Sequence, residues 1–212
     1  MADCCDVLTY EFENVDADGL DAVIKDGQLP QGTELLRISQ NRIFEKDFLS
    51  NKAQVTVAPY KVVTSSLIWK ILIFLKITSS RCDRWLRWPR SKSHHISRRL
   101  EEANALANSA ECVLEEFVNF DLEISVIVSG NGKDVTVFPV QENIHRNNIL
   151  SKTIVPARIS DRLADRAKAI AVKIAEQLNL SGTLCVEMFA TADDIIVNEI
   201  APRPHNSGTT QS

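Results

Sequence analysis

The chain has 212 residues, 44% of them hydrophobic, which is enough apolar material for one or two globular domains. A formal net charge of −4 gives no overall electrostatic reason to expect nucleic acid or an anionic membrane as the main partner. Five cysteines without a CxxC pair predict neither a disulfide framework nor a zinc site, and the acidic N-terminus does not resemble an export signal, so we expect a cytoplasmic protein.

The first 66 residues contain predicted helices and strands. Residues 6–12 have the pattern of a short buried strand, and residues 16–25 have that of a helix capped by Asp16. The spacing of apolar residues over 34–51 predicts one longer helix, and residues 55–63 follow as a strand. This part of the chain is therefore expected to mix α and β structure.

Residues 67–99 differ sharply in composition from the rest. They contain all three tryptophans, nine lysines or arginines, one acidic residue and no glycine, which gives a net charge of +8. One interpretation is a nucleic-acid patch in which Trp85 and Trp88 alternate with arginines. We favour the other, that the window is not an evolved part of the domain, because no strand or helix period persists through it. We therefore expect it to be irregular or poorly packed, and we expect no nucleic acid partner.

The apolar run at 67–77 is too short for a membrane-spanning helix. It covers roughly half of the ~20 residues that such a helix needs. Lys70 and Lys76 also interrupt it. We expect no membrane association.

Regular patterns return from residue 100 onward. We predict a helix at 100–110, a strand at 112–118 and a hairpin over 123–140 that turns at Gly130, Asn131 and Gly132. Residues 158–179 form an amphipathic helix with Ser160 as its N-cap, and a second hairpin over 184–201 turns around 191–194. We expect an α+β domain in which residues 114–199 build one antiparallel sheet and the helix packs across it.

The second hairpin brings two carboxylates together. If its turn centres on Asp193, Glu187 lies opposite Glu199, where like charges destabilise the strands unless a cation lies between them. Mg²⁺ is usually held by one or two carboxylates and substrate phosphates, so we predict both as magnesium ligands. Asn198 needs a bulge to join them, and the alternative is two solvated glutamates on an edge hairpin. Apolar neighbours expected on the same face are Cys185, Phe189, Ile195 and Val197.

The segment APRPHNSG follows this hairpin and displays donors on a stiff loop. Arg203 can pair with a carboxylate or phosphate, and His205 can donate or transfer a proton. An anion would suit this loop together with Asn206. Without the neighbouring carboxylates, the same residues would be ordinary surface.

Other candidate residues lie further upstream. Glu115 and Glu116 end a strand, where a carboxylate and backbone groups can meet an adenine and a ribose, although spacing alone does not show this. Glu123 begins the next strand and is equally consistent with plain surface. His145 lies in a polar loop, where a single histidine is more often inert than functional.

Several strings together resemble the ATP-grasp core of the 5-(carboxyamino)imidazole ribonucleotide synthase family. They are ECVLEEFVNFDLEISVIVSG, FPVQENIHRNN, TIVPARIS, GTLCVEMFA and VNEIAPRPHNSG, and the last is the most diagnostic. The resemblance is continuous over 111–208, and DVLTYEFENVDADGL and LRISQNRIFEKDFL resemble the segment that enters the same domain. It implies an ATP-dependent carbon–nitrogen ligase of purine biosynthesis that carboxylates 5-aminoimidazole ribonucleotide with bicarbonate.

The resemblance also implies residue roles, with ATP and Mg²⁺ as cofactors. Implied nucleotide contacts are the adenine hinge Glu115, Glu116, Phe117 and Val118, then Glu123 on the ribose, His145 nearby, Arg42 as an ATP-contacting arginine, and Asn198 and Glu199. Glu187 and Glu199 are the implied magnesium ligands. Arg203, His205 and Asn206 are the implied catalytic residues, facing bicarbonate and the ribonucleotide. The family also implies a homodimer whose contact regions are partly absent from this chain.

The resemblance divides the chain into segments that correspond to different parts of the family's domains. Residues 1–33 correspond to a remnant of a Rossmann-like first domain, 34–66 to the start of the ATP-grasp domain and 100–208 to its C-terminal core, with a tail at 209–212. The window 67–99 replaces a glycine-rich loop over the ATP phosphates, where small residues let backbone amides approach phosphate. One hypothesis for that window is a frameshift opened near 64–67 and closed near 98–100, and the alternative is a real insertion. The alternative function is a non-catalytic fragment with residual ATP and magnesium binding.

Overall fold

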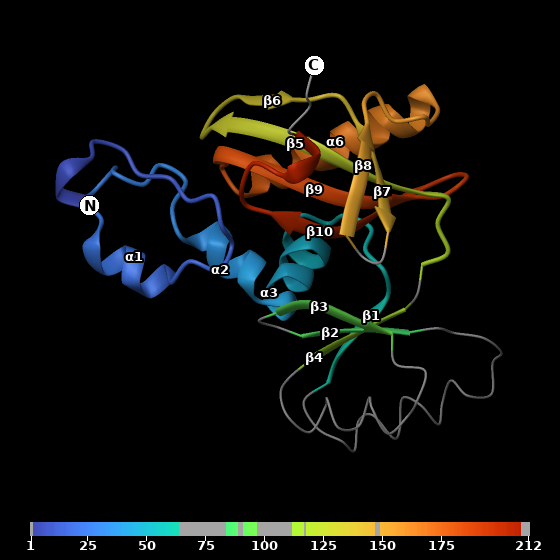
Figure 1. Cartoon of the computed structure of the whole chain (residues 1–212), viewed down its shortest axis with the longest axis horizontal. Coiled ribbons are helices and arrows are strands. Elements are labelled where there is room, and N and C mark those ends of the chain that lie inside the picture. Colours follow the sequence, from blue (N-terminus) through green and yellow to red (C-terminus); the bar gives the residue numbers. More distant parts are fainter. Residues whose placement is uncertain are drawn as a thin grey trace.

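The computed structural model describes residues 2–63, 84–88, 91–96, 112–116, 118–146 and 149–208 (Figure 1). Its helices are α1 (Ala17–Val23), α2 (Glu34–Gln40), α3 (Arg42–Asp47) and α6 (Asp161–Gln177), with short helical turns η1 (Ala2–Cys4), η2 (Phe48–Lys52) and η3 (Asn206–Gly208). Its strands are β1 (Tyr60–Val63), β2 (Arg84–Trp88), β3 (Ser91–Ile96), β4 (Cys112–Glu116), β5 (Leu122–Asn131), β6 (Val135–Val137), β7 (Gln141–Arg146), β8 (Ile149–Ile154), β9 (Ser181–Ala190) and β10 (Ile195–Ala201).

A six-stranded antiparallel sheet forms the main body. Its strand order is β10-β9-β5-β7-β8, and β6 pairs with β5 on the side (Figure 1). One face of the sheet packs on α6, where alternate residues of the strands are buried with the apolar stripe of the helix. Buried core members include Ile124, Val126, Val186, Met188, Ala167 and Ile174. The expected α+β antiparallel fold is confirmed.

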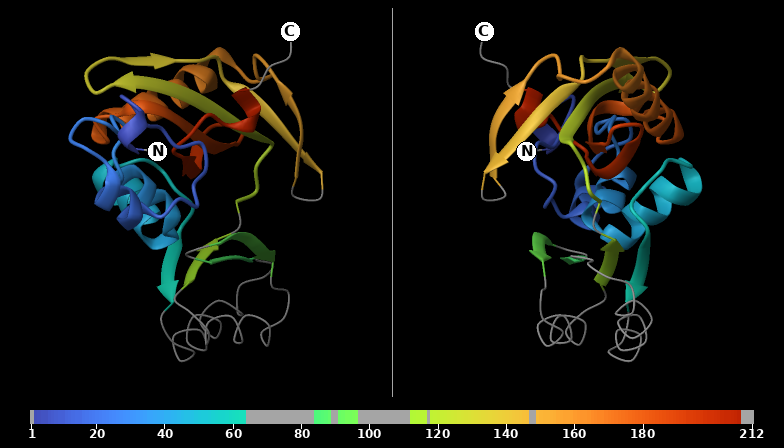
Figure 2. Two further views of the ribbon diagram at one scale, coloured as in Figure 1. Left: turned by 60° about the vertical axis from the view of Figure 1, so that its left-hand side comes forward. Right: turned by 90° about the vertical axis from the view of Figure 1, so that its right-hand side faces the viewer.

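A second, four-stranded sheet has the order β1-β4-β2-β3. The prediction of a single sheet over 114–199 was therefore wrong, because β4 pairs with β1 and β2 instead of with β5. The window 67–99 was expected to be irregular or poorly packed, and the first of these was wrong for β2 and β3, which lie within it and form an antiparallel pair. Figures 1 and 2 show α3 between the two sheets.

The α-helices follow their local sequence signals closely. Asp16 caps α1 by accepting a hydrogen bond from the Asp18 amide, and Ser160 caps α6 by accepting one from the Leu163 amide. The single helix expected over 34–51 is instead α2, α3 and η2. Asn41 makes the break, because its extended backbone ends α2 while its side chain caps α3.

Three other predictions meet different outcomes. Residues 6–12 form no strand, and Leu8 makes a single backbone hydrogen bond to Gln28 instead of a ladder. The strand expected over 55–63 is shortened to β1, with Val57 contributing one isolated bridge to Val197. The helix expected at 100–110 lies outside the described residues. Among the residues that are described, no helix is long and apolar enough to cross a membrane.

Candidate active site

A row of polar residues crosses the larger sheet on the face opposite α6. Gln141 on β7 pairs with Ser125 on β5, Ser125 pairs with Glu187 on β9, and Glu187 pairs with Glu199 on β10. Side chains of directly paired residues share one face of a sheet, so these four positions form a continuous line over four strands. Ser125 and Gln141 are buried, whereas Glu187 and Glu199 are half-buried. The end of the line that solvent can reach is therefore the end with the two carboxylates.

The predicted opposition of Glu187 and Glu199 is confirmed, but a β-bulge produces it. From the turn up to Val197, which faces Met188, the hairpin runs one residue out of the predicted register, and the shift occurs between Val197 and Glu199. Asn198 is the extra residue, as expected. The bulge also corrects a prediction: Ile195 and Val197 do not share the carboxylates' face but are fully buried in the α6 core.

His205 contacts the metal-candidate carboxylate directly. Its Nε2 lies 2.9 Å from Glu187 Oε1, and the two side chains are 10% and 18% exposed. The loop after β10 therefore brings this histidine back over the polar face of the sheet, next to the paired carboxylates. In this arrangement one carboxylate oxygen of Glu187 already has a donor, which reduces its repulsion with Glu199.

Arg203 and Asn206 occupy the same loop. Arg203 Nε donates to Glu13 Oε1 at 3.1 Å, and its Nη1 donates to the Pro204 carbonyl. Glu13 is buried, so the guanidinium has an opposite charge as its partner in a partly desolvated setting. Asn206 begins η3 and is exposed. Of the three predicted anion-binding residues, His205 is thus in direct contact with one of the paired carboxylates.

Arg42 and Glu115 form the centre of a buried charge cluster. Arg42 donates to both oxygens of Glu115, from Nε at 2.8 Å and from Nη2 at 3.1 Å, and its Nη1 donates to Glu45 at 2.6 Å. Lys46 Nζ lies 2.8 Å from the same Glu115 carboxylate. All four side chains are buried. Arg42 therefore acts here as a partner of Glu115, the glutamate predicted at the adenine hinge.

In this cluster, burial and ion pairing shift the pKa values of the charged groups in opposite directions. Burial alone lowers the pKa of Arg42, but the negative charges of Glu45 and Glu115 raise it above its usual value. Burial raises the pKa of Glu45 despite the charge of Arg42. Burial, with the nearby charge of Arg42, lowers the pKa of Lys46 to about 8.

The cluster also holds β10. Glu45 Oε1 accepts the backbone amide of Ile200 at 2.7 Å, and Lys46 Nζ donates to the backbone carbonyl of Asn198 at 3.3 Å. These contacts flank Glu199, whose charge acts on both Arg42 and Glu45. The predicted nucleotide residues Arg42 and Glu115 are thereby connected to the predicted metal strand.

The remaining predicted residues lie near the start of β5. Glu123 on β5 forms an ion-pair contact with His145, which lies on β7 and not in a loop as predicted. Glu116 ends β4 and is half-buried, as is Val118 just beyond it. Phe117 lies outside the described residues. The structure thus brings Glu123 and His145 together, as expected.

Sequence reasoning missed several residues of this face. They are Glu45, Lys46, Ser125, Gln141, Asn143 and Ser207. Gln141 and Asn143 are separated by the charged Glu142, so this segment has no polar–apolar alternation that would indicate its faces. The strand with which they pair carried no signal in the sequence either.

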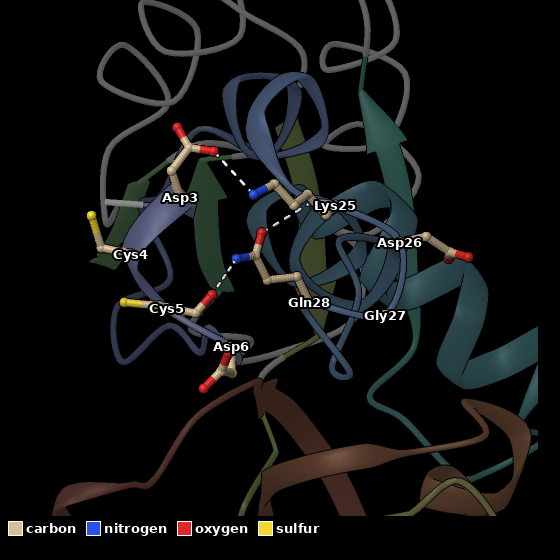
Figure 3. Close-up of a pocket in the computed structure, with 8 residues that line it drawn as sticks. All are labelled: Asp3, Cys4, Cys5, Asp6, Lys25, Asp26, Gly27 and Gln28. Atoms are coloured by element: carbon tan, nitrogen blue, oxygen red, sulfur yellow. Dashed lines mark hydrogen bonds and ion pairs between the residues drawn. The ribbon is translucent and has the colours of Figure 1, made fainter.

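An open pocket of about 490 Å³ lies at the N-terminal end (Figure 3). Lys25 pairs with Asp3 across it at 3.0 Å, and Gln28 Nε2 donates to the Cys5 carbonyl. The ion pair is largely exposed, which makes its energetic contribution small. The pocket is lined by Asp3, Cys4, Cys5, Asp6, Lys25, Asp26, Gly27 and Gln28, and none of these is a candidate site residue.

Comparison with known proteins places the fold in context. The N5-carboxyaminoimidazole ribonucleotide synthase of Bacillus subtilis (strain 168) is 43% identical over 98% of this chain and 56% of its own length. That of Staphylococcus aureus (strain MRSA252) is 39% identical over 96% of this chain and 55% of its own length. The chain thus spans about half the length of these curated relatives.

Solved structures agree with the sequence relatives. A crystal structure of an ADP complex of N5-carboxyaminoimidazole ribonucleotide synthetase matches with a TM-score of 0.87 at 44% identity, over 98% of this chain and 56% of the other. The Aspergillus clavatus enzyme, in complex with ADP and 5-aminoimidazole ribonucleotide, matches with a TM-score of 0.84 at 25% identity, over the same shares. A family model described as the ATP-grasp domain matches residues 90–211. Because that model covers more than half of the sequence, this chain belongs to the ATP-grasp family.

Proposed function

We propose that the chain carries the nucleotide- and magnesium-binding part of a ligase that carboxylates 5-aminoimidazole ribonucleotide with bicarbonate in purine biosynthesis. The observation that carries the proposal is the pairing of Glu187 with Glu199 on the polar face of the sheet. The similarity to synthases of this type supports it. We also propose a cytoplasmic homodimer, which is what the resemblance to this family implies.

Glu187 and Glu199 fit a magnesium ion. Because the two residues face each other across the strands, their Cβ atoms lie ~5 Å apart. Carboxylates supply the hard oxygen ligands that Mg²⁺ prefers. No group of three or more His, Cys, Asp or Glu suited to a metal occurs among the described residues, so nucleotide phosphates and water would complete the coordination. A bound magnesium ion would supply charge neutralisation for the transferring phosphoryl group.

The remaining residues divide between nucleotide and substrate. The strand end at Glu115 to Val118 would bind the adenine, and Glu123 with His145 would bind the ribose. Arg203, His205 and Asn206 would receive bicarbonate and the ribonucleotide. Since Arg203 is already paired with Glu13, an anion there would share the guanidinium with that carboxylate.

The proposed carboxylation has two steps. Bicarbonate attacks the γ-phosphorus of ATP, which forms carboxyphosphate and releases ADP. The amine of 5-aminoimidazole ribonucleotide then attacks the carboxyl carbon, releases phosphate and loses a proton. The residues of this chain would hold ATP, exclude water from carboxyphosphate and keep the amine in line.

A second candidate is magnesium-ATP binding without turnover. The observation that favours it is the window 67–99, which has no glycine where the family carries a phosphate-binding loop. Without backbone amides close to the phosphates, much of the stabilisation of the transferring group is lost. The chain would then retain binding through the carboxylate pair and the adenine site.

An assay of ADP release separates these functions. The purified chain is given ATP, magnesium and bicarbonate, with and without 5-aminoimidazole ribonucleotide, beside a Glu187→Gln, Glu199→Gln double variant. The ligase proposal predicts ADP release that requires bicarbonate and is abolished in the double variant. Asp193→Asn, on the exposed turn of the same hairpin, is expected to behave as wild type. Absent release by a chain that binds ATP would support the second candidate, and release that does not require bicarbonate would contradict the ligase proposal.

A further inference from the structure

Gln31 connects the N-terminal segment, residues 2–33, to the loop that follows β10. Its side-chain amide donates from Nε2 to the Pro202 carbonyl at 2.7 Å, although the two residues lie 171 positions apart in sequence. Its Oε1 accepts a hydrogen bond from Thr9 Oγ1 at 3.3 Å. Pro202 is buried and Gln31 is half-buried. A buried carbonyl needs a donor, and here the donor comes from a distant segment of the chain.

Gly182, the second residue of β9, makes room for the Gln31 side chain. Its backbone has a φ of +139°, and a Cβ atom at this position would lie 3.0 Å from Cγ and Cδ of Gln31. Residues with a side chain rarely adopt that φ, and carbon atoms normally pack further apart than 3.0 Å. The stem of Gln31 therefore packs directly on the backbone of β9, which directs its amide toward Pro202.

Arg203 directly follows the carbonyl that Gln31 holds. Its guanidinium is paired with Glu13, which belongs to the same N-terminal segment. Gln40 on α2 fixes this part of the segment, because its Nε2 donates to the Glu13 and Val15 carbonyls at 2.6 Å each. The N-terminal segment therefore holds Arg203 in two places, the backbone through Gln31 and the side chain through Glu13.

The other end of the loop is anchored on the larger sheet. Ser207 is 1% exposed, and its hydroxyl donates to Gln141 Oε1 on β7 at 2.6 Å. The three predicted anion-binding residues thus lie between an anchor at Pro202 and an anchor at Ser207. The first anchor belongs to the N-terminal segment and the second to the sheet, so the first can be removed without changing a residue of the second.

We propose that Gln31 is a positioning residue for the candidate substrate loop, residues 202–207: its amide holds the Pro202 carbonyl and so sets the direction in which Arg203 faces an anion. The inference deepens the proposed function and rests on it for one consequence, that a positioned Arg203 strengthens the binding of 5-aminoimidazole ribonucleotide. The hydrogen bond itself does not depend on any ligand. The contact and its consequence are therefore tested in separate arms.

Two variants remove the donor at Gln31. Gln31→Glu keeps the shape of the side chain but places a carboxylate oxygen against the Pro202 carbonyl, and Gln31→Met keeps the length without adding a charge. The matched controls are Gln28→Glu and Gln28→Met. Gln28 lies in the same segment and also donates from Nε2 to a carbonyl, that of Cys5 at 2.6 Å, which is not part of the substrate loop (Figure 3).

The first arm is NMR of the ligand-free chain labelled with ¹³C and ¹⁵N, after circular dichroism has shown which variants are folded. An Arg203→Lys variant identifies the Nε–H signal of Arg203. Wild type is expected to show this signal in slow exchange with water, because Nε–H donates to Glu13. Both Gln31 variants are expected to shift the Pro202 carbonyl carbon signal and to speed the Nε–H exchange several-fold, with both signals unchanged in the Gln28 variants.

Two results of the first arm overturn the proposal. One is a rapidly exchanging Arg203 Nε–H in wild type, which decides against the proposal even if neither Gln31 variant folds. The other is a folded Gln31 variant in which the Pro202 carbonyl and Arg203 Nε–H signals are those of wild type.

The second arm is calorimetry of 5-aminoimidazole ribonucleotide binding in the presence of magnesium-ADP, with magnesium-ATP binding measured on the same proteins. Both Gln31 variants are expected to bind the ribonucleotide several-fold more weakly and magnesium-ATP with unchanged affinity, because Gln31 contacts the loop and not the carboxylate pair. Unchanged ribonucleotide affinity, or an equal loss of both affinities, overturns the consequence. If wild type binds no ribonucleotide, the proposed function fails while the first arm still supports or overturns the role of Gln31.

Discussion

Lys46 is fully buried although it carries an ionisable amine, and its surroundings account for this. It shares the Glu115 carboxylate with Arg42, and it donates to the backbone of the bulge on β10. A buried ammonium group without such partners would cost several kcal/mol. The Lys46 side chain therefore contacts two strands, β4 and β10, and its burial lowers the pKa of its amine.

The lowered pKa of Lys46 predicts a pH dependence of stability. Because the folded-state pKa is about 8 and the unfolded value is higher, the unfolded chain binds more protons between these values, and stability rises with pH. Relative to Lys46→Met, wild type is expected to gain about 2–3 kcal/mol between pH 7.5 and pH 10. Urea unfolding at both pH values measures this gain. An unchanged difference between the two proteins would show that Lys46 titrates normally.

At the scale of elements, the last hairpin shows what a sequence pattern can and cannot provide. The turn at 191–194 and the Glu187–Glu199 pairing follow from alternation and turn chemistry. The faces of Ile195 and Val197 do not, because one extra residue exchanges the two faces of everything before it. The bulge is held by Lys46, which lies far away in sequence and carries no local signal of this contact.

Strand pairing limits the prediction of the polar face in the same way. Ser125 and Gln141 lie on the two strands that follow that of Glu187 in the sheet, and each of the two is unremarkable in its own segment. Only the order β9-β5-β7 places them in one line. Ser207 was visible in the loop APRPHNSG, but its burial depends on that line. The strand predicted at residues 6–12 was wrong for a related reason. Its pattern is strand-like, but without a partner strand it forms no ladder.

Arg158 joins β7 to the segment before α6. It donates from Nε at 2.9 Å to Glu142, whose side chain is buried, and the bond to Arg158 lowers the pKa of Glu142. This contribution to stability is present above the unfolded pKa and lost as pH falls through the folded one. Arg158→Met is expected to lower the unfolding free energy at pH 7, because it leaves the buried Glu142 carboxylate without its charged partner.

Denaturant unfolding of both proteins at pH 7 and near pH 3 tests this pair. The difference in unfolding free energy is expected to shrink at the lower pH, because protonated Glu142 no longer attracts the guanidinium. Arg162→Met is the control, since Arg162 is also exposed but contacts Asp193, an exposed partner. A difference that stays constant with pH would mean that the packing of Arg158, and not its charge, stabilises the fold.

The core under α6 gives a further prediction. Ile174 is fully buried against the sheet, while Ile170, one turn earlier, is only partly buried. Ile174→Ala is expected to lower the unfolding free energy by about 2–5 kcal/mol, because it removes apolar contact and leaves a cavity. Ile170→Ala should cost clearly less. Urea midpoints of the two variants measure this, and equal losses would contradict the assignment of the buried face.

At the scale of the whole molecule, α3 connects the two sheets. Arg42 and Lys46 bind Glu115 on β4, and Glu45 and Lys46 bind β10. The candidate adenine strand and the candidate metal strand are thereby held by one short helix. A nucleotide bound between these two strands would contact both sheets and would place its phosphates near the carboxylate pair.

The most direct test of this account is calorimetry of magnesium-ATP binding to the wild-type chain and the Glu187→Gln, Glu199→Gln double variant, with Asp193→Asn as control. Circular dichroism and urea unfolding establish first that all three are folded. The account predicts that wild type and Asp193→Asn bind with equal affinity and that the double variant loses at least tenfold, ~1.4 kcal/mol. Equal binding by all three, or no binding by a folded wild-type chain, would contradict the assignment of the hairpin as the magnesium-nucleotide site.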